Sequence, residues 1–245
     1  METVLVLDSA AVSTRGPRPD NQDSAVGGPL LVAIADGVGG NVGGAVASSL
    51  VATWLAPLAV GSTGEGSDDP VRVVASANER IRAAYTERPR LRTMATTLTA
   101  VHVDAEGLVL LHIGDSRGYL LSGGELNQVS TDHTLVQALI DAGSLTPAEA
   151  RVHPQRSAVY AALHGADDDV AALDVIRLEA ARRPGDGLLR RALRRRPPGT
   201  SSSGSSPPAP LPRPPRRCGT PRWPARRRTT SPWRRRRARD RRVPR

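Results

Sequence analysis

The chain has 245 residues, enough for one medium-sized domain, and its net charge of +10 is distributed unevenly. Residues 1–187 contain 14 arginines and 23 acidic residues, a net charge of −9, whereas residues 188–245 contain 20 arginines and one acid, a net charge of +19. A single cysteine argues against a disulfide framework, and no apolar run suggests a membrane span. The first 30 residues lack a signal-peptide pattern, so we expect a cytoplasmic protein.

Apolar runs separated by turn residues predict alternating strands and helices up to residue 187. Strands are predicted at residues 2–13, 29–36, 95–104, 107–115, 116–130 and 174–180, with tight turns at the strings AEG (105–107) and GGE (123–125). Helices are predicted at residues 43–60, at 68–87 and, as two short helices, at 134–154. Pro70 in the first turn supports the second helix, and a Thr-Pro-x-Glu start at Thr146 supports the last.

The pattern changes after the string RPGDG at residues 183–187. Residues 188–245 are rich in Arg, Pro and Ser and show no apolar periodicity. Such a segment cannot bury enough apolar surface to offset the entropy cost of ordering it. We therefore expect a domain at 1–187, incomplete at its C-terminal end, followed by a disordered tail at 188–245.

Acidic residues occur where apolar strands end. Asp36 and Asp115 each close a strand-like run, in the strings ADGVGG and HIGDSRGYL, and Asp23 closes the turn RPDNQD. Carboxylate and carbonyl oxygens suit Mg²⁺ or Mn²⁺, and no Cys/His pairing favours Zn²⁺. Any one of these residues could be a turn cap or a solvated side chain, but their order together favours a metal site.

Six strings occur in order along residues 10–187: RPDNQDS, VAIADGVGG, MATTLTAV, HIGDSRGYLL, STDHTLVQALIDAGSLTPAEARVHPQRS and RPGDG. In these strings the chain resembles the metal-dependent serine/threonine protein phosphatases of the PPM (PP2C-type) family, bacterial branch. The resemblance implies an α+β fold, a four-layer αββα sandwich of two mainly antiparallel sheets flanked by helices. In that fold the metals lie at one edge, between the sheets.

The resemblance also implies roles for individual residues. Asp36 would bridge two Mn²⁺ or Mg²⁺ ions, and the Gly37 carbonyl would bind one of them. Asp23 would hold metal-bound waters, and Asp115 would help to hold a third, weaker ion. Arg18 would bind the substrate phosphate, which a guanidinium suits in charge and shape. Arg18 and Asp36 are thus the expected catalytic residues.

The implied reaction is hydrolysis of phosphoserine and phosphothreonine in proteins by a metal-activated water. The expected partners are phosphorylated proteins, including a bacterial serine/threonine kinase or its substrates, and not a membrane. One alternative is a non-catalytic descendant that binds phosphoproteins or regulates a kinase. Another is that the arginine-rich tail binds nucleic acid, although it contains only Trp223 and Trp233 as aromatic residues. His133 and His153 are expected to shape the fold.

The chain departs from the family pattern after residue 187. The family continues with an SDG string and ends near a DN string, and both aspartates bind the first metal; neither string occurs here. Residues 188–200 can be encoded by DNA that, read in a shifted frame, gives Cys-Ser-Asp-Gly-Leu-Ser-Asp. Residues 228–233 can hide an Asp-Asn string, but in a different frame. We interpret the tail as the product of a frame shift and expect this chain to be a poor enzyme.

Overall fold

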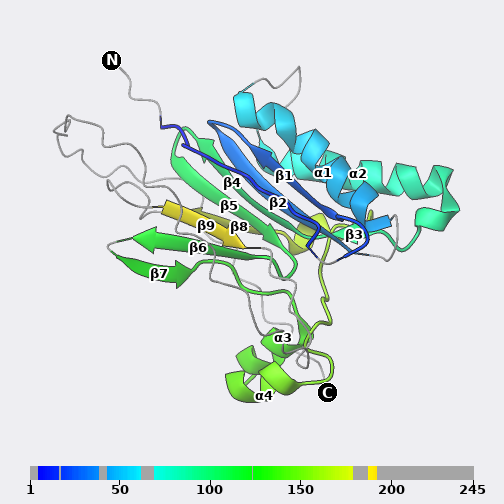
Figure 1. Ribbon diagram of the computed structural model, residues 1–245, viewed down its shortest axis with the longest axis vertical. Coiled ribbons are helices and arrows are strands. Elements are labelled where there is room, and N and C mark those ends of the chain that lie inside the picture. Colours follow the sequence, from blue (N-terminus) through cyan, green and yellow to red (C-terminus); the bar gives the residue numbers. More distant parts are fainter. Residues whose placement is uncertain are drawn as a thin grey trace, which may run out of the picture. The chain divides into compact units, whose positions relative to one another are not determined.

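The computed structural model describes residues 5–16, 18–38, 43–61, 69–122, 124–178 and the backbone of 187–191. These residues form two antiparallel sheets, two long helices and two short ones (Figure 1). The larger sheet runs β1-β2-β4-β5-β8, with β3 paired to β2; the smaller runs β7-β6-β9. This arrangement confirms the α+β class and the two antiparallel sheets expected from the sequence.

Short loops join the paired strands β1–β2, β4–β5 and β6–β7, and the other pairings bring together distant segments of the chain. The larger sheet contains β1 (Asp23–Gly27), β2 (Leu31–Val38), β3 (Ala95–Thr96), β4 (Leu98–Asp104), β5 (Gly107–Ile113) and β8 (Asp174–Leu178). The smaller contains β6 (Arg117–Ser122), β7 (Glu125–Gln128) and β9 (Gly187–Arg191). Every residue of β5 is buried, which is why its sequence GLVLLHI is apolar without alternation.

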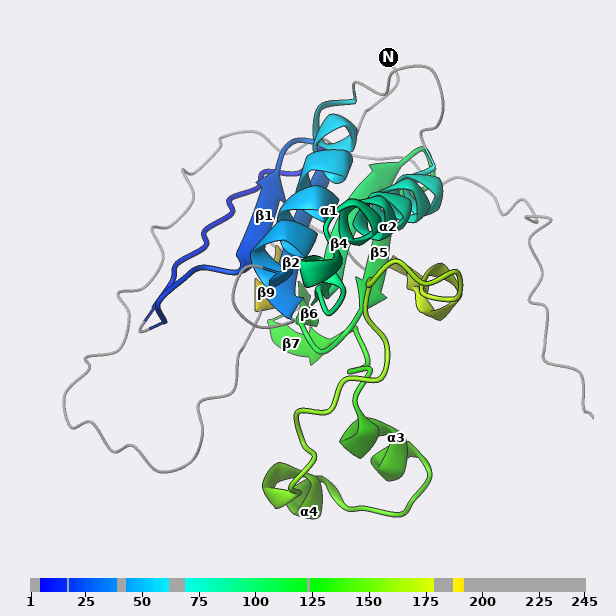
Figure 2. The ribbon, with the colours of Figure 1, turned by 90° about the vertical axis from the view of Figure 1, so that its right-hand side faces the viewer.

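Two helices cover one face of the larger sheet. α1 (Gly43–Val60) and α2 (Pro70–Glu87) pack side by side over the strands, as both views show (Figure 1 and Figure 2). α2 begins where the Asp69 carboxylate accepts a hydrogen bond from the Val71 N–H, with Pro70 in its first turn. α1 is apolar and long enough to cross a membrane, but it packs as a core helix, with Val51 and Leu55 fully buried.

The smaller sheet covers the opposite face of the larger one. A second apolar cluster lies there, formed by Val101, Val103, Leu108, Leu110 and Leu178. Gly118 of β6 comes so close that a Cβ on it would lie 3.5 Å from a Leu110 methyl group and 3.6 Å from the Thr99 methyl group. The described residues thus form a layer of helices, the larger sheet and the smaller sheet.

Two short helices project beyond the ends of the sheets. α3 (Leu135–Asp141) and α4 (Pro147–Val152) lie together, apart from both sheets (Figures 1 and 2). α4 begins with a capping box, in which Thr146 and Glu149 each accept the other's backbone N–H. Two 3₁₀ turns complete the list of elements: η1 (Pro89–Leu91) and η2 (Val170–Ala172).

Two predicted elements differ from the structure. Residues 5–15 form no strand, because they make only isolated bonds to the domain, such as Leu7 N–H to the Pro29 carbonyl. By contrast, β6 ends at Ser122 and β7 begins at Glu125, as the turn predicted at the string GGE requires. The predicted disordered tail begins at residue 188, inside β9, where backbone pairing to β6 provides order that composition does not indicate. The rest of that tail lies outside the described residues.

Candidate active site

Asp23 and Asp36 lie directly opposite each other on paired strands. β1 and β2 are antiparallel, and their register aligns Asp23 with Asp36. Side chains that face each other across an antiparallel pair share one side of the sheet, with Cβ atoms about 5 Å apart. The register therefore brings together two carboxylates that are 13 residues apart in the chain.

The two carboxylates are on the side of the sheet that faces the smaller sheet. Side chains alternate along a strand, so Asp36 shares a side with Val32, which packs on the cluster between the sheets. Leu31 and Ala33 point the other way, into the helix-covered core. Asp36 is only 6% exposed. An acid that is this buried requires compensating polar or charged partners.

Gly37 is required by the close approach of three backbone segments. A Cβ on Gly37 would lie 2.1 Å from the Gly44 carbonyl oxygen and 2.5 Å from the Gln22 carbonyl oxygen. The Gly37 N–H donates to that Gln22 carbonyl at 3.0 Å. Any larger residue would push α1 away from β2. The packing fixes the end of the strand that carries Asp36.

Two buried hydroxyl groups connect Asp36 to the turn that carries Asp115. The Asp36 N–H donates to the Thr97 hydroxyl at 3.1 Å, and that hydroxyl lies 2.9 Å from the Ser116 hydroxyl. A further hydroxyl, on Thr99, donates to the Ser116 carbonyl at 3.0 Å. The end of β2 that carries Asp36 and the turn that carries Asp115 are thus anchored to the same segment, residues 97–99. The sequence predicted no role in the site for Thr97, whose only signal is a hydroxyl inside an apolar strand.

Arg18 is exposed, in the turn that precedes β1. Its backbone N–H donates to the Arg15 carbonyl at 3.4 Å. Within the described residues its guanidinium makes no hydrogen bond or ion pair. The part that Arg18 plays in binding phosphate therefore stays a prediction, as do the metal-binding roles of Asp23, Asp36, Gly37 and Asp115.

Three polar residues on neighbouring strands, Thr99, His112 and Asp174, form a polar row on the same side of the larger sheet. The register aligns Thr99 of β4 with His112 of β5, and His112 with Asp174 of β8. The His112 Nε2–H donates to the Thr131 carbonyl at 2.9 Å, and Nδ1 lies 3.1 Å from the Thr99 hydroxyl. Burial lowers the pKa of His112, and the neighbouring His133 lowers it further.

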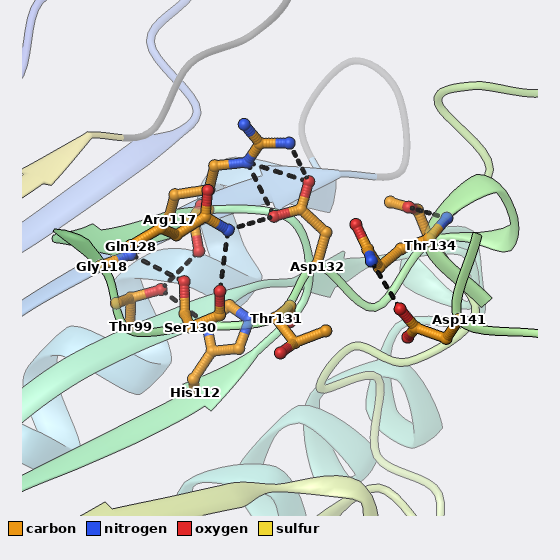
Figure 3. Close-up of polar contacts among 12 residues, drawn as sticks. Thr99, His112, Arg117, Gly118, Gln128, Ser130, Thr131, Asp132, Thr134 and Asp141 are labelled. Carbon is orange, nitrogen blue, oxygen red and sulfur yellow. Dashed lines mark hydrogen bonds and ion pairs between the residues drawn. The ribbon is translucent and has the colours of Figure 1, made fainter. Parts of the chain in front are cut away.

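An ion pair fastens the loop before α3 to β6. The Arg117 guanidinium binds Asp132 through two nitrogens, with the shortest contact at 2.6 Å (Figure 3). Gln128 donates to the same carboxylate at 3.4 Å. The Asp132 side chain is 6% exposed and that of Arg117 31%. The hydrogen bond to Asp132 raises the pKa of Arg117, so the guanidinium stays charged.

The donors at the end of β2 fit a hard divalent cation. They comprise two carboxylates on one side of the sheet and the adjacent Gly37 carbonyl, and Mg²⁺ commonly binds one or two carboxylates and keeps several waters. Among the described residues, however, no three His, Cys, Asp or Glu side chains gather closely enough to hold a metal ion. The donor set therefore has the right chemistry and forms only part of a coordination shell.

The sequence model of the Protein phosphatase 2C family matches residues 17–156, more than half of the chain. The chain belongs to the protein phosphatase 2C family. The match includes Arg18, both facing aspartates and the Asp115 turn.

Among curated proteins, the chain is 47% identical over 165 residues to the serine/threonine protein phosphatase PstP of Mycobacterium tuberculosis, covering 66% of this chain and 32% of PstP. It thus spans about a third of that relative's length. A crystal structure of M. tuberculosis PstP/Ppp is similar with a TM-score of 0.68 at 44% identity, over 76% of this chain and 78% of that one. The crystal structure of the PstP catalytic domain in complex with two manganese ions has a TM-score of 0.65 at 41% identity, over 76% of each chain.

Proposed function

We propose that this chain is the catalytic domain of a metal-dependent protein serine/threonine phosphatase of the protein phosphatase 2C family. The observation that carries the proposal is the register of β1 and β2, which sets Asp23 against a buried Asp36 beside Gly37. Proteins similar to this chain are serine/threonine phosphatases, and one was crystallised with two manganese ions. The proposed cofactor is accordingly Mn²⁺ or Mg²⁺.

The protein's own residues perform two tasks in this proposal. Asp36 and the Gly37 carbonyl would hold the cations, with Asp23 holding metal-bound waters, and Arg18 would bind the phosphate of the substrate through its guanidinium. When bound, two divalent ions lower the pKa of a water and neutralise phosphate oxygens, so no covalent intermediate is needed. The packing around Gly37 and the Thr97 hydroxyl keep Asp36 in place between the sheets.

The proposed substrates are phosphorylated serine and threonine residues of proteins, among them a bacterial kinase or its substrates, and the proposed location is the cytoplasm. This chain lacks the SDG and DN aspartates, so we expect it to bind cations weakly. A version restored to the family frame after residue 187 regains two carboxylate ligands and is expected to turn over faster.

The test compares the 245-residue chain, the frame-restored protein and the frame-restored Asp36→Asn variant, with a phosphothreonine peptide and p-nitrophenyl phosphate. We expect Mn²⁺-dependent turnover in the frame-restored protein, its loss on chelation, and little turnover in the other two. Asn keeps the shape of Asp36 without its charge, so metal-dependent turnover retained in Asp36→Asn would contradict the proposal. Peptide binding without turnover in all three would favour the non-catalytic alternative.

A further inference from the structure

Asp115 lies in a turn, and the residues on either side of it, Gly114 and Ser116, are both held by contacts with Thr97. The turn, residues 114–116, connects β5 to β6. On its C-terminal side Ser116 is bound by Thr97 and Thr99. On its N-terminal side Gly114 has a φ of +109° and packs against Thr97, where a Cβ would lie 2.4 Å from the threonine methyl group. The turn therefore has little freedom of its own.

His133 binds both backbone groups of Gly114. The Gly114 N–H donates to His133 Nδ1 at 3.2 Å, and the His133 N–H donates to the Gly114 carbonyl at 2.8 Å. His133 is 6% exposed, and its ring lies against His112, with ring centres 5.1 Å apart. This double contact spans 19 residues of sequence and ends one residue before Asp115.

The contacts of His133 define its tautomer. Nδ1 accepts a hydrogen bond from an amide, so it carries no proton. Nε2 lies 3.1 Å from a carboxylate oxygen of Asp174 on β8, and a carboxylate only accepts, so Nε2 carries the proton. Asp174 stands beside His112 in the polar row, which places its carboxylate on the side of the sheet that His133 contacts. A carboxylate on one ring nitrogen fixes the orientation and hydrogen-bonding role of the other.

We propose that His133 is a positioning residue of the phosphatase site: in its Nε2–H tautomer, held by Asp174, it sets the Gly114–Asp115 turn. In this proposal Asp174 orients the His133 ring, His133 holds the Gly114 backbone, and Gly114 in turn positions Asp115. The claim that His133 holds the turn in this tautomer depends only on its hydrogen bonds to Gly114 and Asp174. The consequence for catalysis rests on the proposed function, because it requires Asp115 to serve the site. The sequence predicted only that His133 shapes the fold.

The first experiment needs no activity. In the 245-residue chain labelled with ¹⁵N-histidine, two-bond ¹H–¹⁵N correlation spectra report which ring nitrogen carries the proton. The His133 signals are those that disappear in His133→Asn. We expect a protonated Nε2 and a bare Nδ1, maintained in Asp174→Asn, whose amide oxygen still accepts, and a mixture of tautomers in Asp174→Ala. A protonated Nδ1 in the unaltered chain, or an unchanged tautomer in Asp174→Ala, would overturn the proposal.

The second experiment follows the Gly114 amide by hydrogen exchange. His133→Leu removes the acceptor and should speed exchange at Gly114 at least about tenfold, while the Asn side chain of His133→Asn offers an oxygen near the place of Nδ1 and should restore most of the protection. His153→Leu is the matched control, because His153 ends α4 away from the turn, and it should leave exchange at Gly114 unchanged. Equal exchange at Gly114 in His133→Leu and His133→Asn would contradict the positioning role.

The third experiment uses the frame-restored protein. We expect His133→Leu to lower kcat or raise the Mn²⁺ concentration for half-maximal rate about 10–100-fold, the effect typical of lost support to a metal-binding residue. KM for the phosphopeptide should stay nearly constant, and His133→Asn should recover most of the rate. A rise in KM alone would overturn the positioning role. If the frame-restored protein shows no turnover at all, the proposed function fails, and the tautomer and exchange results still decide the structural claim.

Discussion

Asp36 and Thr97 are joined in both directions across neighbouring strands. The Asp36 N–H donates to the Thr97 hydroxyl at 3.1 Å, and the Thr97 N–H donates to the Asp36 carbonyl at 3.0 Å. The same hydroxyl contacts Ser116, next to Asp115. One threonine therefore links the β2 backbone at Asp36 to the side chain that follows Asp115.

Replacing Thr97 with valine tests this connection. Valine has nearly the same shape but offers no acceptor to a buried donor, so we expect a loss of about 1–3 kcal/mol in the free energy of unfolding. Thr97→Ser keeps the hydroxyl and should lose less. Urea denaturation measures both variants. Equal stability of the valine variant and the unaltered chain would show that the hydroxyl contributes nothing.

Gly37→Ala should be among the most destabilising single changes in the domain. The new Cβ would meet the backbone carbonyls of Gly44 and Gln22, and neither can rotate away. We expect a loss of about 3 kcal/mol or more. Gly27→Ala is the matched control in β1, because its Cβ would make ordinary contacts of 3.5 Å or longer. The comparison fails if thermal melts of the two variants coincide.

Arg117→Ala should leave Asp132 buried without its main partner. The Asp132 side chain is 6% exposed, and we expect a loss of about 2–3 kcal/mol, reduced from the value for a fully buried pair because Arg117 is partly exposed. Arg117→Lys keeps the charge but not the two-nitrogen contact, so its free energy of unfolding should lie between those of the unaltered chain and Arg117→Ala. A double variant, Arg117→Met with Asp132→Leu, should recover part of the stability, and denaturation of all three checks the order.

His112 should make the domain less stable in mild acid. Burial lowers its pKa in the folded state below the value of about 6.5 in the unfolded chain. At pH below about 6.5 the unfolded chain therefore binds more protons, and the free energy of unfolding falls as pH falls towards the folded pKa. Above about pH 6.5 this histidine does not make the free energy of unfolding depend on pH. Urea titrations at about pH 7.5 and 5.5 should differ less in His112→Gln, which keeps a donor for Thr131. An equal difference in the two proteins would assign the acid sensitivity elsewhere.

Arg18→Ala should raise KM for phosphopeptides in the frame-restored protein more than it lowers kcat. The guanidinium is expected to bind phosphate in the ground state and the transition state alike, and such uniform binding affects KM. Arg72→Ala removes an exposed arginine of α2, paired with Asp69, and serves as the control. A fall in kcat at constant KM would instead mean that Arg18 acts in the transition state.

Local sequence determined most of the helices and strands. The helix predicted at 43–60 matches α1, and Pro70 marked the first turn of α2, because helix-start signals act within a few residues. Ordered motifs were sufficient to predict the family, because the type and order of the residues carry that information, and the roles of Asp23, Asp36 and Asp115 stay predictions.

Only the tertiary structure decided which of these residues meet and what holds them. The pairing of Asp23 with Asp36, the polar row from Thr99 to Asp174, and the grip of His133 on Gly114 all depend on strand register and on contacts between distant segments. Register is set by packing across the whole sheet, and a shift of one residue would turn Asp36 to the helix-covered side. The same reason explains β9 and residues 5–15: pairing with a neighbouring strand, or its absence, overrides local composition.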